Sequence, residues 1–188
     1  WSPLIPESTV GMEIHMIDVG QGDAIAIRSP RGRWVVVDAG GGRATGDAGR
    51  RVVVPYLRRL GGDLAMFVMT HPHDDHVGGA AALITLLRPA DIRDAAFAGT
   101  SPSYREALSA AKEIGVPWHR IHPGDSADVD GMIVTFLAPD SAWTESLRDP
   151  NLASAMMLVR YHDVRFLLTG DAELPEEQWL LDHAAARS

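Results

Sequence analysis

The sequence predicts an α/β domain in which mixed sheets are layered against helices. Three observations indicate this class. Strand-like segments fill most of the first 40 residues, strands and helices are mixed after them, and the glycines at 40–42 do not form the G-x-G-x-x-G turn of a purely parallel dinucleotide-binding fold. With 188 residues, of which 46% are hydrophobic, the chain is long enough to bury the core of one domain.

The first elements indicate a hairpin followed by a buried strand. Residues 1–11 contain two prolines and are expected to be a lead-in, so the domain is expected over 12–188. Met12–Val19 alternates apolar and polar residues, as a half-buried strand does, and the turn after it leads into a second strand over Ala24–Arg28. Trp34–Val37 is fully apolar, which predicts a strand that is covered on both faces.

The rest of the chain alternates between helical and extended patterns. A helix is expected from a cap at Asp47 to about Leu60, and Pro55 should kink or split it. Further strands are expected over 64–70, 92–97, 116–121, 132–137, 155–161 and 164–168, and further helices over 78–88, 102–115 and 175–185.

Composition excludes several classes of protein. The absence of cysteine excludes a disulfide framework, a cysteine nucleophile and a cysteine-ligated zinc site. No apolar run approaches the ~18–20 residues that a membrane span requires. The net charge of −8 argues against nucleic-acid binding driven by overall charge.

The charge is distributed unevenly. Residues 28–60 contain eight arginines and only two aspartates, while the rest of the chain is acidic. Either these arginines form a solvated helix face and turns, or they form a local rim that attracts anions. The sequence leaves both interpretations open.

The strongest functional signal is the segment Thr70–Gly79, which reads THPHDDHVGG and follows an apolar strand. Residues two apart in an extended chain share a side, so His71 and His73 can reach one metal ion. Asp75 and His76 come where the chain turns into a helix and can hold a second ion. Two ions ~3.5–4 Å apart can clamp a phosphoryl or carbonyl group. Nitrogen and oxygen ligands without thiolate suit zinc, manganese or iron.

Two aspartates at other strand ends are candidates for the same site. Asp38 follows the strand over Trp34–Val37, and Asp171 follows the last predicted strand through Thr169-Gly170. Asp171 could bridge two cations, and Asp38 could hold a ligand histidine from behind. Taken alone, each would more often be a turn former or a helix cap.

At these residues the chain resembles the metallo-β-lactamase fold superfamily, and within it the hydrolase domain of ComEC-type competence proteins and their free-standing relatives. The matching segments occur in the family's order. They are Ile17–Ala24 (IDVGQGDA), Val37–Gly40 (VDAG), Thr70–Gly79, Pro102–Arg105 (PSYR), Asn151-x-x-Ser154 and Leu167–Glu173 (LLTGDAE).

The resemblance implies a four-layer αββα sandwich with a metal centre at its open edge. By the family's pattern, His71 and His73 would ligate the first metal, Asp75 and His76 the second, and Asp171 would bridge them. Asp38 would support the ligands from the second shell. The cofactors implied are two divalent ions, zinc or manganese.

Two departures from the family concern the metal ligands. Members usually supply another histidine before the bridging aspartate, and this stretch offers His119, His122 or the Asn151-x-x-Ser154 element. Members also continue past the last helix with a His-His-Gly-Ser segment, whereas this sequence ends at Ser188, and His183 does not match. We therefore expect a domain that is incomplete at its C-terminus, which leaves the completeness of the second metal site open.

The resulting prediction is a metal-dependent hydrolase, a phosphodiesterase or nuclease. In it, hydroxide activated by the metal attacks a phosphodiester of DNA, and Asp75 or Asp171 acts as the catalytic residue that orients it. Single-stranded DNA is the expected partner. The alternatives are hydrolysis of a small phosphodiester, lactone or thioester, and a non-catalytic binding domain. The resemblance also favours an extracytoplasmic or membrane-associated location, as part of a larger membrane protein or as a free-standing relative.

Overall fold

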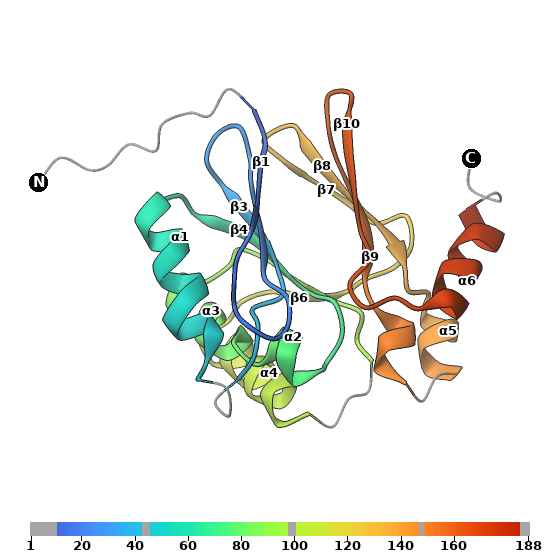
Figure 1. The fold of residues 1–188 in the computed structure, drawn as a ribbon, viewed down its shortest axis with the longest axis horizontal. Helices are drawn as coiled ribbons and strands as arrows, with labels where there is room; N and C mark the ends of the chain where they lie inside the picture. Colours follow the sequence, from blue (N-terminus) through green and yellow to red (C-terminus); the bar gives the residue numbers. More distant parts are fainter. Residues whose placement is uncertain (1–10, 43–45, 98–100, 147–148, 185–188) are drawn as a thin grey trace, which may run out of the picture.

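The computed structural model describes residues 11–42, 46–97, 101–146 and 149–184. Ten of the eleven residues of the predicted lead-in, and the predicted end of the last helix at Ala185, lie outside the described residues. Two sheets face each other, and helices lie on the outer side of each (Figure 1).

The first sheet has six strands in the order β1-β2-β3-β4-β5-β6. The hairpin and the strand after it pair antiparallel, and the later strands pair parallel to β3. The strands are β1 Glu13–Met16, β2 Ile25–Arg28, β3 Trp34–Val37, β4 Leu64–Met69, β5 Ile92–Asp94 and β6 Trp118–Arg120.

Helices of the first half cover the outer face of this sheet (Figure 1). They are the π-helix η2 Gly49–Val53, followed by α1 Val54–Leu60, α2 Asp74–Val77, α3 Ala80–Leu87 and α4 Pro102–Ile114. The expected division near Pro55 is confirmed, because regular α-helix begins only at Val54. Asp47 accepts a hydrogen bond from the backbone of Arg50, and Ser101 caps α4.

The second sheet has four antiparallel strands in the order β10-β9-β8-β7. Short helices connect and flank these strands. The elements are β7 Ser126–Val129, β8 Met132–Ala138, α5 Ser141–Ser146, the 3-10 helix η3 Pro150–Ala153, β9 Met156–Tyr161, β10 Val164–Leu168 and α6 Leu174–Ala184.

Three hydrophobic clusters separate four layers. The side chains of β3 show the arrangement, because Trp34 and Val36 pack toward the helices while Val35 and Val37 pack between the two sheets. A smaller cluster around Met156 and Trp179 lies between the second sheet and α6. The αββα sandwich expected from the resemblance is therefore confirmed.

Several elements differ from the sequence prediction. β7, α5 and η3 were not predicted, since each is short and mostly polar or irregular in pattern. The strand expected over 92–97 ends at Asp94, because Ala96 takes a positive φ of 54° that turns the chain. The strand expected over 116–121 is reduced to Trp118–Arg120.

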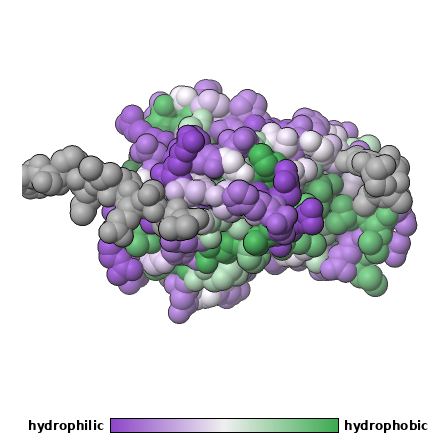
Figure 2. All heavy atoms as spheres, turned by 90° about the horizontal axis from the view of Figure 1, so that it is seen from above, coloured by the Kyte–Doolittle hydropathy of each residue, from purple (hydrophilic) through white to green (hydrophobic). Residues whose placement is uncertain are grey.

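The outer strand β10 is the least covered strand of the second sheet. Val164, Phe166 and Leu167 on β10 are 51%, 42% and 53% exposed. Figure 2 shows hydrophobic surface interspersed with hydrophilic surface on the face seen from above in Figure 1.

Among the described residues, no helix combines the length and apolar character that crossing a membrane requires.

Candidate metal centre

The candidate site lies where β3 and β4 end. These strands are parallel neighbours, so their carboxyl ends meet at one edge of the sheet. Asp38 follows β3 with a positive φ of 58°, and the segment from Thr70 to His73 leads from β4 into α2. The topology therefore places Asp38 beside the histidine segment.

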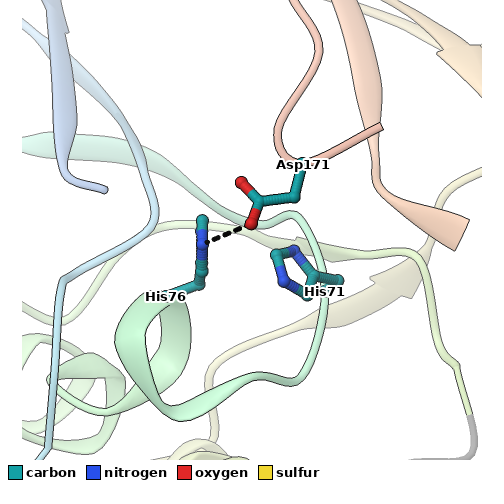
Figure 3. A group of neighbouring side chains, drawn as sticks. All are labelled: His71, His76 and Asp171. Atoms are coloured by element: carbon teal, nitrogen blue, oxygen red, sulfur yellow. Dashed lines mark ion pairs between the residues drawn. The ribbon is translucent and has the colours of Figure 1, made fainter. Parts of the chain in front are cut away.

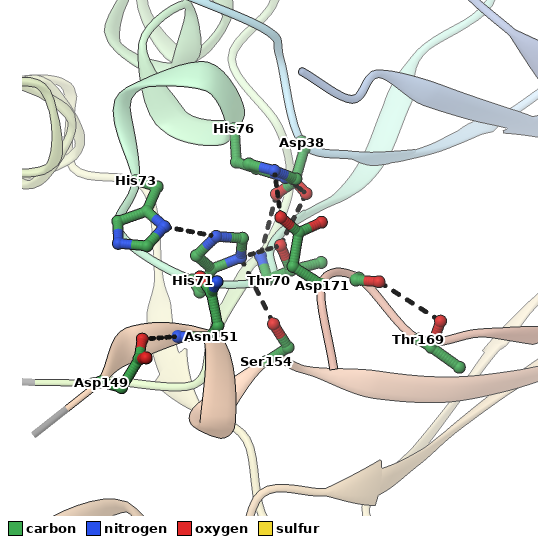
Figure 4. Close-up of polar contacts among 11 residues, drawn as sticks. Asp38, Thr70, His71, His73, His76, Asp149, Asn151, Ser154, Thr169 and Asp171 are labelled. Carbon is green, nitrogen blue, oxygen red and sulfur yellow. Dashed lines mark hydrogen bonds and ion pairs between the residues drawn. The ribbon is translucent and has the colours of Figure 1, made fainter. Parts of the chain in front are cut away.

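Asp38 is 1% exposed and accepts three hydrogen bonds. The backbone N–H of Thr70 donates to Oδ1 over 2.9 Å, and the Thr70 hydroxyl donates to Oδ2 over 2.6 Å. His76 Nδ1 lies 2.8 Å from the same Oδ2 (Figure 4). This contact fixes the His76 ring and leaves its Nε2 free to face the site.

Asp38 also orients His71, through Thr70. The Thr70 hydroxyl uses its one proton on Asp38, so its oxygen accepts from His71 Nδ1, which lies 3.1 Å away. The Ser154 hydroxyl lies 3.4 Å from the same ring nitrogen. With its proton on Nδ1, His71 presents the lone pair of Nε2 to the site.

Asp171 reaches the site from the second sheet. It follows β10 through Gly170, where a Cβ would lie 3.0 Å from the Cβ of Thr70. Asp171 Oδ2 lies 3.3 Å from His76 Nε2, and ligand atoms of His71, His76 and Asp171 all lie within 4.8 Å of one another (Figure 3). The two sheets therefore supply ligands to one point.

The spacing of the ligand atoms fits a bound cation. His71 Nε2 and His73 Nδ1 lie 3.1 Å apart, and His76 Nε2 and Asp171 Oδ2 lie 3.3 Å apart. Two ligand atoms that each lie 2.0–2.1 Å from a tetrahedral ion are about 3.3 Å from each other. These two pairs could hold the two divalent ions that the sequence predicts.

His73 contacts His71 but lies outside the group of ligand atoms within 4.8 Å that the described residues form, and Asp75 also lies outside that group. Asp75 is half-buried on α2, and its backbone packs on the turn before β2, where a Cβ on Gly22 would lie 1.7 Å from the Asp75 carbonyl oxygen. Its role as a ligand or catalytic residue stays a prediction.

Burial and charge set different protonation states for the two buried histidines. Burial, together with the neighbouring His76, lowers the pKa of His71 to about 4, so His71 is a neutral potential ligand at pH 7. For His76, burial lowers the pKa, but the hydrogen bond to Asp38 and the charges of Asp38, Asp171 and Asp75 outweigh burial and raise the pKa to about 9. Cation binding at His76 therefore requires release of a proton.

The other candidate histidines do not join this cluster. His119 Nδ1 lies 2.6 Å from Asp91, and His122 Nδ1 lies 3.4 Å from Asp125, both at exposed positions. By contrast, the Asn151-x-x-Ser154 element lies beside His71 (Figure 4).

Two residues contribute to the site in ways that the sequence analysis missed. Thr70 connects Asp38 to His71 by hydrogen bonds. Its position between a buried strand and the first histidine could have indicated this role. Asp23 lies in the turn that precedes β2. Its pKa is raised by burial, and its charge interacts with His76, Asp38 and Asp171, so it adds to the negative charge around the site.

Four of the described arginines in residues 28–60 make separate contacts away from the site. Arg33 pairs with Asp130, Arg50 with Asp47, and Arg58 donates to the carbonyl of Leu86. Arg28 is buried and stacks over Trp34. These separate contacts favour the interpretation as a helix face and turns.

Comparison with known sequences gives relatives of the expected kind. ComE operon protein 3 of Bacillus subtilis (strain 168) is 27% identical over 184 residues, which cover 90% of this chain and 23% of that protein. Recombination protein 2 of Haemophilus influenzae is 28% identical over 166 residues, which cover 88% of this chain and 19% of that protein. The chain thus spans less than a quarter of the length of these curated relatives.

Solved structures share the fold at low sequence identity. A metallo-beta-lactamase from Staphylococcus aureus subsp. aureus COL superposes with a TM-score of 0.54 at 13% identity, over 87% of this chain and 44% of that one. The metallo-beta-lactamase fold protein YhfI from Bacillus subtilis gives 0.54 at 12% identity, over 85% and 62%. The family model of the Metallo-beta-lactamase superfamily matches residues 17–187, and the chain belongs to that superfamily.

Proposed function

We propose that this chain is a metal-dependent phosphodiesterase that cleaves DNA, with single-stranded DNA as its substrate. The family supports a metal-dependent hydrolase. The observation that carries the proposal is the pair of facing ligand contacts, His71–His73 and His76–Asp171, at the junction of the two sheets. The relatives named for the ComE operon and for recombination favour DNA as substrate.

The residues of the site have separable roles in this proposal. His71, His73, His76 and Asp171 would hold two divalent cations, which supply charge for a phosphoryl oxygen and lower the pKa of water. Asp38 holds His76 directly and His71 through Thr70, so the ligand nitrogens are positioned before a cation arrives.

The two aspartates proposed as catalytic lie at different depths. Asp171 is exposed at the end of β10, so its carboxylate can reach both the cation cluster and a bound phosphodiester, and we assign it the orientation of the attacking water. Asp75 is the second candidate for this role.

The relatives are the basis for a proposed cellular setting. We propose that the chain is the hydrolase domain of a longer protein, because the ComE operon relative is about four times as long as the matched region. The resemblance to competence proteins favours action at or outside the cytoplasmic membrane. A free-standing relative is the alternative.

The test measures hydrolysis of bis(p-nitrophenyl)phosphate and of labelled single-stranded DNA with Mn²⁺ or Zn²⁺. His73→Ala is expected to reduce the rate at least 100-fold, because it removes one partner of the His71 pair. His119→Ala is the matched control, since that imidazole contacts Asp91 away from the cluster and should leave the rate unchanged.

Each outcome separates the candidate functions. Cleavage of both substrates that depends on His73 supports the proposal. Turnover of the small phosphodiester without DNA cleavage would replace DNA by a small substrate. Cation binding without any hydrolysis would favour a non-catalytic binding domain, and turnover that survives His73→Ala unchanged would overturn the proposed site.

A further inference from the structure

The 3-10 helix η3 brings Asn151 next to the histidine segment. The Asp149 carboxylate accepts a hydrogen bond from the Asn151 backbone over 3.0 Å, and Trp143 donates to the carbonyl of Leu152 over 2.8 Å. Just after η3, the Ala155 backbone donates to the carbonyl of Thr70 over 2.9 Å. The C-terminal end of η3 is thus fixed against the segment that carries His71.

The side-chain oxygen of Asn151 is buried and has no hydrogen-bond partner among the described residues. Leaving such an acceptor unpaired is unfavourable. The side chain points from η3 toward the imidazoles of His71 and His73 (Figure 4). A buried, unpaired oxygen aimed at two imidazoles is the arrangement expected when a cation completes the contact.

His71 and His73 are the two imidazoles assigned to the first cation, and Asp171 would be shared with the second cation. A catalytic site of this type usually takes three protein ligands and leaves one position for water or substrate. His119 and His122 are engaged by Asp91 and Asp125, away from the cluster.

We propose that Asn151 Oδ1 is a ligand of the cation held by His71 and His73, and that it biases this position toward a hard ion such as Mn²⁺ over Zn²⁺. The inference rests on the proposed function, because it requires that the cluster binds a cation. Carbonyl oxygens suit manganese and magnesium, whereas imidazole suits zinc equally or better.

A purely structural role would use different atoms. The backbone of Asn151 makes two hydrogen bonds. Its N–H donates to the Asp149 carboxylate, and its carbonyl accepts from the backbone N–H of Ser154. Both contacts survive removal of the side chain. Asn151→Ala is therefore expected not to lower the thermal stability of the metal-free protein.

The test is calorimetric titration of metal-free protein with Mn²⁺ and, separately, with Zn²⁺. Asn151→Ala should weaken Mn²⁺ binding at least 10-fold, and Asn151→Asp, which keeps an oxygen in place, should bind Mn²⁺ at least as tightly as the wild type. Asn151→His should raise the affinity for Zn²⁺ relative to Mn²⁺ at least 10-fold. Gln178→Ala removes an exposed amide on α6 and serves as the control.

The failures are distinguishable. Wild-type protein that binds neither ion would overturn both the proposed function and this inference. Wild-type protein that binds Mn²⁺, together with an Asn151→Ala variant that binds it equally well, would overturn only the role of Asn151. Loss of Mn²⁺ binding in the Asp variant would also overturn it, since an oxygen would then be present without effect.

Discussion

Glu176, in the first turn of α6, should make the folded protein lose stability as the pH rises. Its side chain is 0% exposed, and neither carboxylate oxygen has a hydrogen-bond partner among the described residues. Burial raises the pKa of Glu176 from 4.5 to about 9. At neutral pH the folded chain therefore holds a proton that the unfolded chain has released.

The size of the effect follows from proton linkage. Between pH 4.5 and about 9 the folded state binds one more proton than the unfolded state, so the free energy of unfolding falls as the pH rises. The slope is about 1.4 kcal/mol per pH unit, which gives roughly 3 kcal/mol between pH 6 and pH 8. This contribution is complete below pH 4.5 and is lost by about pH 9.

The assay is urea denaturation of metal-free protein at pH 6, 7 and 8, comparing the wild type with Glu176→Gln. Glutamine has the same shape and does not titrate. The free energy of unfolding of the variant should therefore rise by about 1.4 kcal/mol relative to that of the wild type with each unit of increasing pH. Glu177→Gln is the control, because Glu177 is exposed on the same helix turn. Parallel pH profiles for wild type and Glu176→Gln would refute a protonated Glu176.

Two further predictions test the support of the site and the joining of the sheets. Asp38→Asn should weaken Mn²⁺ binding 10- to 100-fold in calorimetric titration, because the carboxylate orients His76 and Thr70; equal affinity would contradict this role. Asp130→Ala should lower the free energy of unfolding by about 1.5–3 kcal/mol in urea, because Asp130 is 5% exposed and accepts a 2.7 Å charged hydrogen bond from Arg33. An unchanged denaturation midpoint would show that this pair does not stabilise the contact between the two sheets.

The sequence was sufficient to predict the parts of the site that lie close together along the chain. His71, His73 and His76 are separated by at most five positions, so local geometry already limits where their rings can point. Asp38 could be predicted because it follows a fully apolar strand, and such strands are buried with their carboxyl ends at functional edges.

The hydrogen-bond chain through Thr70 could not be predicted in the same way. In this chain Asp38 accepts hydrogen bonds from both the hydroxyl and the backbone N–H of Thr70, which is 32 positions away from Asp38 in the sequence. Only the parallel pairing of β3 with β4 brings them together. Glu176 was missed for a related reason, because its burial depends on the packing of α6 against η3 and the second sheet.

The candidate site joins a buried part of the fold to an exposed strand. His71 and His76 are 0% and 2% exposed and lie just after β4 and on α2, whereas Asp171 follows β10, whose side chains are mostly exposed. An attraction between Asp171 and His76 therefore helps hold a weakly covered strand in place. A cation shared by these residues would bind only when both sheets are docked, so its binding free energy would stabilise the contact between them. Positioning of the catalytic group and attachment of β10 would then depend on the same interaction.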